Sequence, residues 1–101
     1  IIVVAEPRLN TSVNITNSIN VYPNPVIDVT NLQITTGYQN ATIGIIISDI
    51  RGRILKSYQV TSIPGTSIQQ LNFSNLAKGV YAVTVYFGDI EKKTVKLLKM
   101  E

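Results

Sequence analysis

The chain has 101 residues, of which 45% are apolar and 15% charged, and its net charge is +3. This length and composition indicate one folded domain with a modest hydrophobic core. The sequence has no cysteine and no histidine. Disulfides, sites built on thiolate or imidazole ligands, and nucleophiles that depend on a histidine base are therefore excluded. No apolar run is long enough to be a transmembrane span.

The first nineteen residues are rich in Asn, Ser and Thr and alternate only weakly. We interpret residues 1–19 as a linker with room for one added edge strand, and residues 20–101 as the folded domain. Next, the stretch VYPNPVIDV places two prolines around Asn24. Because proline fixes φ and lacks an N–H donor, this stretch cannot be a central strand or a helix interior. It predicts a rigid corner that ends an edge strand and leads into the next strand.

Period-two alternation of apolar and polar residues recurs along the rest of the chain, and no window has convincing helical periodicity. Such alternation is typical of strands with one buried face. The side chains that we expect on the inward faces of the strands are Leu32, Ile34, Ile43, Ile45, Ile47, Leu71, Phe73, Tyr81, Val83, Val85, Phe87, Val95 and Leu97.

Turn signals separate these runs. Gly52 in DIRGRIL is expected to close a hairpin, since glycine readily takes a positive φ. SIPGTS contains a Pro-Gly turn, and Gly88 with Asp89 predicts another tight hairpin. About seven strands, spaced roughly 8 to 12 residues apart, predict an all-β, immunoglobulin-like antiparallel β-sandwich.

The polar residues do not indicate an enzyme. The six carboxylates are scattered along the sequence, and no Ser–Lys pair stands out as a nucleophile with its base. Asp28 and Asp49 lie where turns begin, where an aspartate usually accepts hydrogen bonds from local backbone N–H groups. We therefore expect no catalytic residues, no metal ion and no cofactor.

Basic residues gather near the end of the chain, where Lys92, Lys93, Lys96 and Lys99 fall within ten positions. Such a tail can bind acidic lipid, polyanionic sugar or nucleic acid. We favour the simpler interpretation, lysines on the solvent face of an edge strand that guard against aggregation. No aromatic residues are interleaved with them as in single-strand-binding proteins, so nucleic acid is not expected as a partner. We expect Lys93, Lys96 and Lys99 to contribute little to stability.

The order of these features resembles the C-terminal sorting domain of the type IX secretion system, over residues 21–101. The matching segments are VYPNPVID, SDIRGRIL, LNFSNLAKGVYAVTV and KKTVKLLK. Thr30 and Asn31 depart from the family's alternation and leave the register of the second strand open. The residues that match the family signature are Pro23, Asn24, Pro25, Asp28, Gly52, Arg53, Gly79 and Tyr81, together with Lys93, Lys96 and Lys99 of the tail.

The resemblance implies a non-catalytic signal that directs its cargo from the periplasm, through the outer-membrane translocon, to the cell surface or the medium. In most members of this family a sortase-like peptidase cuts upstream of the domain and joins the cargo to anionic lipopolysaccharide, whereas some members keep the domain as a surface attachment or sugar-binding part. We expect such a cut before Asn20, because LNTSVNITNS is polar and suited to reach a peptidase as an extended chain.

Two other functions stay open. One is an immunoglobulin-like spacer or a module of a surface protein that binds glycan or lipopolysaccharide, and the other is a small hydrolase. For Pro23 and Pro25 the sequence leaves open a structural role or direct contact with the receptor, while Gly79 and Tyr81 are expected to serve the loop and the core.

Overall fold

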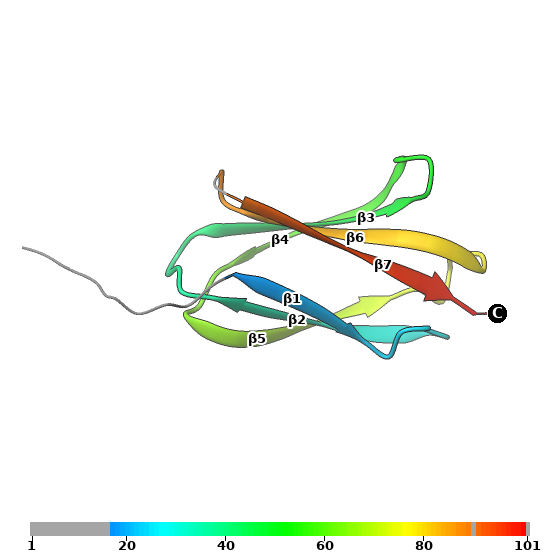
Figure 1. The fold of residues 1–101 in the computed structure, drawn as a ribbon, viewed down its shortest axis with the longest axis horizontal. Coiled ribbons are helices and arrows are strands. Elements are labelled where there is room, and N and C mark those ends of the chain that lie inside the picture. Colours follow the sequence, from blue (N-terminus) through cyan, green and yellow to red (C-terminus); the bar gives the residue numbers. More distant parts are fainter. Residues whose placement is uncertain (1–16, 90, 101) are drawn as a thin grey trace, which may run out of the picture.

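The computed structural model of the chain describes residues 17–89 and 91–100. These residues form seven strands and no helix (Figure 1). The strands are β1 (Ser18–Tyr22), β2 (Val29–Thr36), β3 (Thr42–Asp49), β4 (Ile54–Thr61), β5 (Gly65–Asn72), β6 (Gly79–Phe87) and β7 (Glu91–Lys99). Within the same two stretches, nothing has the length and hydropathy of a membrane-spanning helix.

The strands form two packed sheets, with strand orders β1-β2-β5 and β4-β3-β6-β7, and every pairing of neighbouring strands is antiparallel. Figure 1 shows them as two layers. The predicted immunoglobulin-like sandwich is thus confirmed. β4 pairs with β3 in the larger sheet, whereas the constant-type immunoglobulin domain places its fourth strand beside the fifth. The Pro-Gly turn at residues 64–65 consequently joins the two sheets, and the hairpins are those at Gly52 and Gly88.

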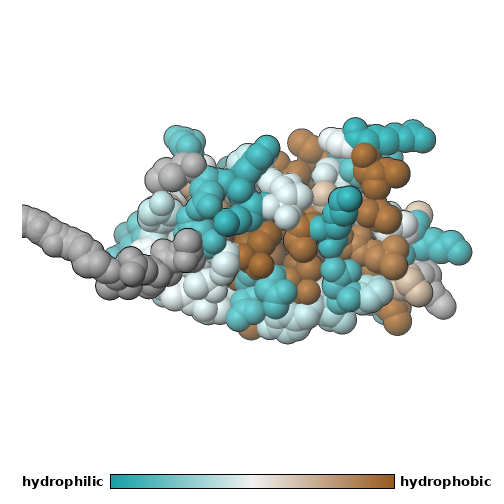
Figure 2. Space-filling model, in the orientation of Figure 1, coloured by the Kyte–Doolittle hydropathy of each residue, from teal (hydrophilic) through white to brown (hydrophobic). Residues whose placement is uncertain are grey.

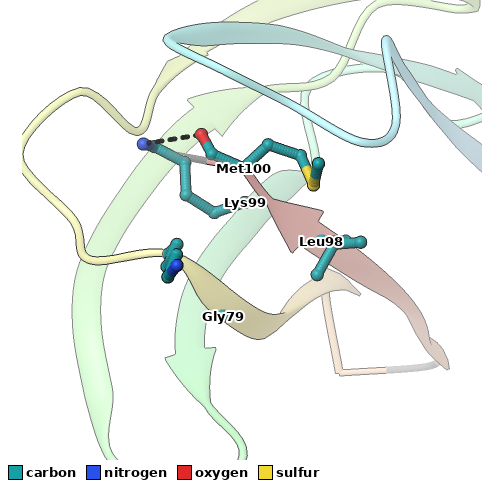
Figure 3. A pocket seen from close by; sticks show the side chains of 5 residues that line it. Gly79, Leu98, Lys99 and Met100 are labelled. Atoms are coloured by element: carbon teal, nitrogen blue, oxygen red, sulfur yellow. Dashed lines mark hydrogen bonds between the residues drawn. The ribbon is translucent and has the colours of Figure 1, made fainter.

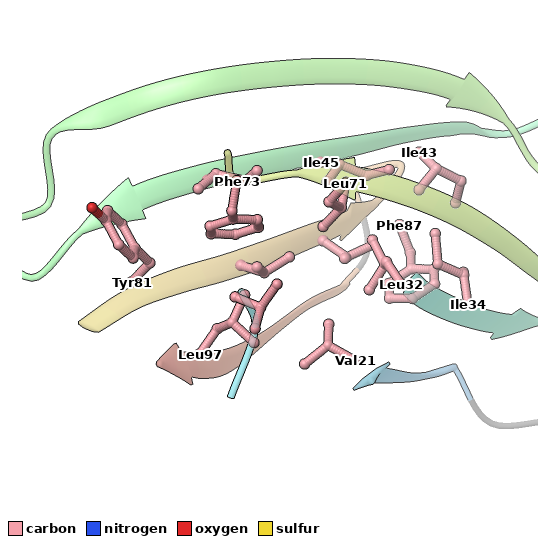
Figure 4. Close-up of a cluster of buried hydrophobic side chains, with 14 residues drawn as sticks. Val21, Leu32, Ile34, Ile43, Ile45, Leu71, Phe73, Tyr81, Phe87 and Leu97 are labelled. Atoms are coloured by element: carbon pink, nitrogen blue, oxygen red, sulfur yellow. The ribbon is translucent and has the colours of Figure 1, made fainter. Parts of the chain in front are cut away.

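The core lies between the two layers and contains nearly all the side chains expected to point inward (Figure 4). Every residue of that set is buried except Val95, which is half-buried against the cluster. The register of β2 is now defined, because Thr30 and Thr36 are also buried and share the inner face with Leu32 and Ile34. Period-two alternation therefore identified the buried faces of β2, β3, β5, β6 and β7 correctly.

β1 and β7 are edge strands of different sheets and lie on the same side of the sandwich. In Figure 2, which views the molecule from this side, apolar surface is visible between the two layers. β1 begins at Ser18, within the segment that we interpreted as a linker, and Asn17 before it is buried. The added strand was considered for residues 1–19, of which residues 1–16 lie outside the described residues.

Candidate functional site

Most of the signature residues lie at one end of the sandwich. The turn between β1 and β2, the hairpin between β3 and β4, the loop between β5 and β6, and the end of β7 all lie at this end (Figure 1). We call it the C-terminal end. The signature residues found there are Pro23, Asn24, Pro25, Asp28, Gly52, Arg53, Gly79, Tyr81, Lys96 and Lys99. Lys93 lies near the start of β7, towards the opposite end.

The Pro-Asn-Pro corner pairs with the outer backbone edge of β7. The Asn24 side chain acts as a substitute peptide group: its Nδ2 donates to the Lys96 carbonyl at 3.0 Å, and its Oδ1 accepts from the Leu98 N–H at 3.1 Å. Val26 continues this pairing, since its N–H donates to the Leu98 carbonyl and its carbonyl accepts from the Met100 N–H, both at 2.8 Å. An unpaired strand edge is a template for another chain, and the corner covers it here.

The two prolines end β1 and turn the chain into β2, as expected from their φ restriction. The Tyr22–Pro23 and Asn24–Pro25 peptide bonds are both cis. The Pro23 carbonyl accepts a hydrogen bond from the buried Thr30 hydroxyl at 2.8 Å. Both proline rings are exposed, so the corner is anchored through main-chain atoms while its side chains face solvent.

Asp28 and Asp49 play different parts in the turns where they lie. The Asp28 main-chain carbonyl accepts from the Phe73 N–H at 2.7 Å and ties the corner to the loop after β5. Asp49 behaves as predicted: its Oδ1 accepts from the N–H groups of Arg51 and Arg53 at 2.9 and 3.0 Å. The expectation of a local side-chain cap is therefore confirmed for Asp49, and at Asp28 the observed contact comes from the backbone.

The Gly-Arg hairpin is held by Asp49 as well as by the glycine. Gly52 has a φ of +86° and donates its N–H to the Asp49 carbonyl at 3.0 Å. The Arg53 guanidinium lies 3.2 Å from Asp49 Oδ2. The hydrogen bond from the Arg53 backbone N–H, followed by that from Arg51, lowers the pKa of Asp49 below its ordinary value of 3.8.

Gly79 and Tyr81 form the corner that leads into β6. The Tyr81 hydroxyl donates to the Ala77 carbonyl four residues earlier, which is the tyrosine corner of immunoglobulin-like sandwiches. The ring of Tyr81 packs edge-to-face on Phe73, with 5.8 Å between ring centroids. Gly79 has a φ of +150°, so the backbone itself favours glycine there. The expected structural roles of both residues agree with this geometry.

The prediction that all three signature lysines are exposed is wrong for Lys99, which has only 2% of its surface exposed. Lys99 follows Leu97 on the inward face of β7, and its aliphatic stem is buried while Nζ donates to the Met100 carbonyl at 3.3 Å. Lys99 and Met100 line an open hollow of about 820 Å³, together with Lys78, Gly79 and Leu98 (Figure 3). The aliphatic stem of Lys99 packs in the interior of the sandwich. Lys99 is therefore part of the fold, although we expected it to lie on the surface.

The other two lysines have separate surroundings. Lys96 is exposed at the C-terminal end. Lys93 is half-buried, and its Nζ lies 3.3 Å from Glu91 Oε2. Glu91 also accepts from the Asn17 amide at 2.8 Å, and this bond, more than Lys93, lowers the pKa of Glu91 below 4.5. Asn17 in turn accepts from the Thr36 hydroxyl at 2.7 Å, a buried link that the sequence did not indicate.

The surface of the C-terminal end combines apolar and basic side chains. Figure 2 shows apolar surface concentrated around it. The exposed apolar residues there are Tyr22, Ile27, Val29, Ile50, Ile54, Val80, Leu98 and Met100. The exposed basic residues there are Arg51, Arg53, Lys78 and Lys96. Within residues 17–89 and 91–100 there is no group of three acidic, cysteine or histidine side chains that could hold a metal ion. The arrangement suits recognition of another molecule.

The family model of the secretion system C-terminal sorting domain matches residues 20–100. The chain belongs to this family. The resemblance seen in the sequence is thereby confirmed, and the sorting domain is a C-terminal signal of type IX secretion, which implies export of the attached cargo to the cell surface or the medium. No curated protein matches the chain.

The Asn24 amide should be worth more to stability than an ordinary exposed asparagine. Asn24→Ala removes two hydrogen bonds to β7 and should lower the free energy of unfolding by about 1–3 kcal/mol, measured by urea unfolding. Asn75→Ala, an exposed asparagine in the β5–β6 loop, is the matched control and should change it by less than about 0.5 kcal/mol. Equal effects of the two substitutions would contradict the role given to Asn24.

The Asp49 carboxylate should make the stability of the hairpin depend on pH. Since the folded-state pKa is lowered, the stabilisation is present above the ordinary pKa and is lost as the pH falls through the folded-state value. The sorting domain should therefore be more stable than its Asp49→Asn variant at neutral pH, and this difference should disappear in acid. Urea unfolding of both proteins across that range measures it, and a difference independent of pH is the contrary result.

Proposed function

We propose that the sorting domain is a non-catalytic export address that the outer-membrane translocon reads at the C-terminal end of the sandwich. The observation that carries this proposal is the convergence there of signature residues from four separate segments. Exposed basic and apolar side chains surround them. Such a mixture favours a protein partner, because apolar contacts supply affinity while charges orient the encounter.

The contacts divide the signature into residues that build this end and residues that are free to meet a partner. Asn24 and Tyr81 use their polar atoms on the domain's own backbone. Pro23, Pro25 and Lys96 expose their side chains beside the covered edge of β7. The exposed set is what a receptor would contact, and the buried set fixes the geometry in which it is presented.

We base the remaining steps of the proposed export route on membership of the sorting-domain family. The cargo would reach the translocon from the periplasm, and a sortase-like peptidase would cut upstream of the sandwich and join the cargo to anionic lipopolysaccharide. Arg51, Arg53 and Lys78 are exposed basic residues that line one shallow pocket at the C-terminal end. They would provide the attraction for phosphate-bearing sugar or lipid.

Export should depend on exposed charges at the C-terminal end and not on those elsewhere. A reporter fused ahead of Ile1 and produced in a strain with the type IX system should reach the surface. Combined Arg53→Gln and Lys96→Gln substitutions should strand it in the periplasm, because the receptor loses two contacts. Folding should survive, since exposed ion pairs contribute little to stability; circular dichroism of the purified domain checks this.

The matched control is the combined Lys92→Gln and Lys93→Gln variant, which removes the same charge near the start of β7. It should be delivered normally. Equal delivery of both variants would refute reading at the C-terminal end, and delivery of a reporter without the domain would refute the sorting function and favour a spacer. Removing KLLKME is less informative, because it deletes the buried Leu97 and Lys99 and so unfolds the sandwich.

Processing should fall before Asn20, and the contacts of Asn17 support a position further upstream still. Asn17 is buried and joins Thr36 to Glu91, and Ser18 begins β1, so a peptidase would have to unfold this edge to cut later. N-terminal sequencing of the domain released in the export assay should therefore give a residue at or before position 17. A first residue beyond Tyr22 would contradict the proposal.

A further inference from the structure

The smaller sheet presents an outer face without charge. β1, β2 and β5 contain no charged residue, although 15% of the whole chain is charged and exposed protein surface is usually richer than that. Natural edge strands often carry lysine or other charges, and both edges of this sheet lack them. The sheet is the lower layer of Figure 1. Its uncharged outer face therefore needs an explanation of its own.

The strand register shows which side chains share this face. Residues paired across antiparallel strands point to the same side of a sheet. One row contains Tyr22, Asn31 and Gln70, and the next contains Asn20, Gln33 and Ile68. These two rows form a grid of four amides with one aromatic and one aliphatic residue at opposite corners, which we call the amide grid.

The polar groups of the amide grid are available to a ligand. None of its four amide side chains forms a hydrogen bond with another residue in the described part of the chain, whereas Thr35 and Thr66 in the adjoining row bond to each other at 3.1 Å. Tyr22 and Ile68 have 38% and 54% of their surface exposed. Each amide supplies donors and an acceptor, so the grid offers paired hydrogen bonds beside two apolar contacts.

The absence of charge on this face restricts the chemical class of ligand that it can bind. Nucleic acid, anionic lipid and acidic polysaccharide are attracted by lysine and arginine, and this face has none. Neutral sugar hydroxyls donate and accept, as amides do, and the ring of Tyr22 offers an apolar surface for the face of a sugar. β2 and β5 have eight residues each and β1 has five. At about 4.8 Å between strands and about 3.4 Å per residue, the face covers roughly 340 Å², less than half of what each partner buries in a standard protein interface.

We propose that the amide grid binds a neutral polysaccharide, laid as an extended chain across β1, β2 and β5. The face is too small for a stable dimer of sorting domains. This function is separate from export, because the grid lies on the outer side of the smaller sheet and the proposed receptor contacts lie at the C-terminal end. The exported domain would then contact glycan with one surface and the secretion machinery with another.

Affinity electrophoresis of the 101-residue chain tests the proposal. Native gels that contain laminarin, dextran, mannan or xylan are the neutral probes, and an alginate gel is the acidic comparison. At least one neutral gel should retard the protein. Tyr22→Ala and Gln33→Ala should each raise the dissociation constant about 3- to 10-fold, through loss of stacking or of a hydrogen bond.

Matched controls come from the outer face of the other sheet. Tyr86 has the same 38% exposure as Tyr22, and Gln59 is an exposed glutamine on β4; Tyr86→Ala and Gln59→Ala should change binding less than 2-fold. The proposal is overturned if no neutral gel retards the protein, if only alginate does, or if the controls weaken binding equally. It is also overturned if light scattering shows a dimer that Gln33→Lys dissociates, since a second copy would then occupy the face. Export of the Gln33→Ala, Tyr86→Ala and Gln59→Ala variants should be normal, which separates this result from the sorting function.

Discussion

The pairing of the Pro-Asn-Pro corner with β7 is the contact on which the rest of the domain depends. β7 contributes Leu97 and Lys99 to the interior, yet only β6 pairs with it as a regular strand. The corner supplies the partner on the other edge through Asn24 and Val26, over sequence separations of 72 and 74 residues for the two Asn24 bonds. Two further hydrogen bonds fix the start of β2: the Thr30 hydroxyl donates to the Pro23 carbonyl, and the Phe73 N–H donates to the Asp28 carbonyl. Without it, the last strand would have one free edge and a loosely held end.

This arrangement gives much of the family signature a physical meaning. Asn24 replaces a peptide group, Asp49 and Gly52 close a hairpin, and Gly79 with Tyr81 turns the chain into β6. Each of these residues acts on the backbone of the C-terminal end. A sequence motif spread over the whole domain therefore describes the construction of one local surface, and the side chains left exposed on that surface differ in kind from those that build it.

Local patterns predicted the strands well because burial follows a period of two. The isoleucines of β3 and the alternating apolar residues of β6 were assigned to the correct face for that reason. The same pattern failed at Lys99, because its charge was taken as a sign of exposure although its position on β7 is an inward one. Charge at the tip of a long aliphatic stem says little about where the stem lies.

Other features of the structure could not be predicted from local sequence patterns. The Pro-Gly turn at Gly65 looks the same whether it joins two strands of one sheet or two sheets, since φ alone does not determine the pairing. Asn24 bonds to Lys96 and Asn17 bonds to Glu91, and both of these partners lie more than 70 residues away in the sequence. The amide grid becomes visible only when β1, β2 and β5 are known to be neighbours, because each strand by itself contains just two of its residues.

The position of β7 also determines when the domain can fold. The corner lies near the beginning of the domain and its partner strand at the end, so their hydrogen bonds close a loop that spans nearly the whole sequence. A chain that is still being made, or that stops short of residue 97, lacks the inward residues of this strand and the backbone groups that hold the corner. The completed sandwich thus requires that β7 is present. A recognition step that requires the folded C-terminal end would pass over truncated products without any separate device to detect them.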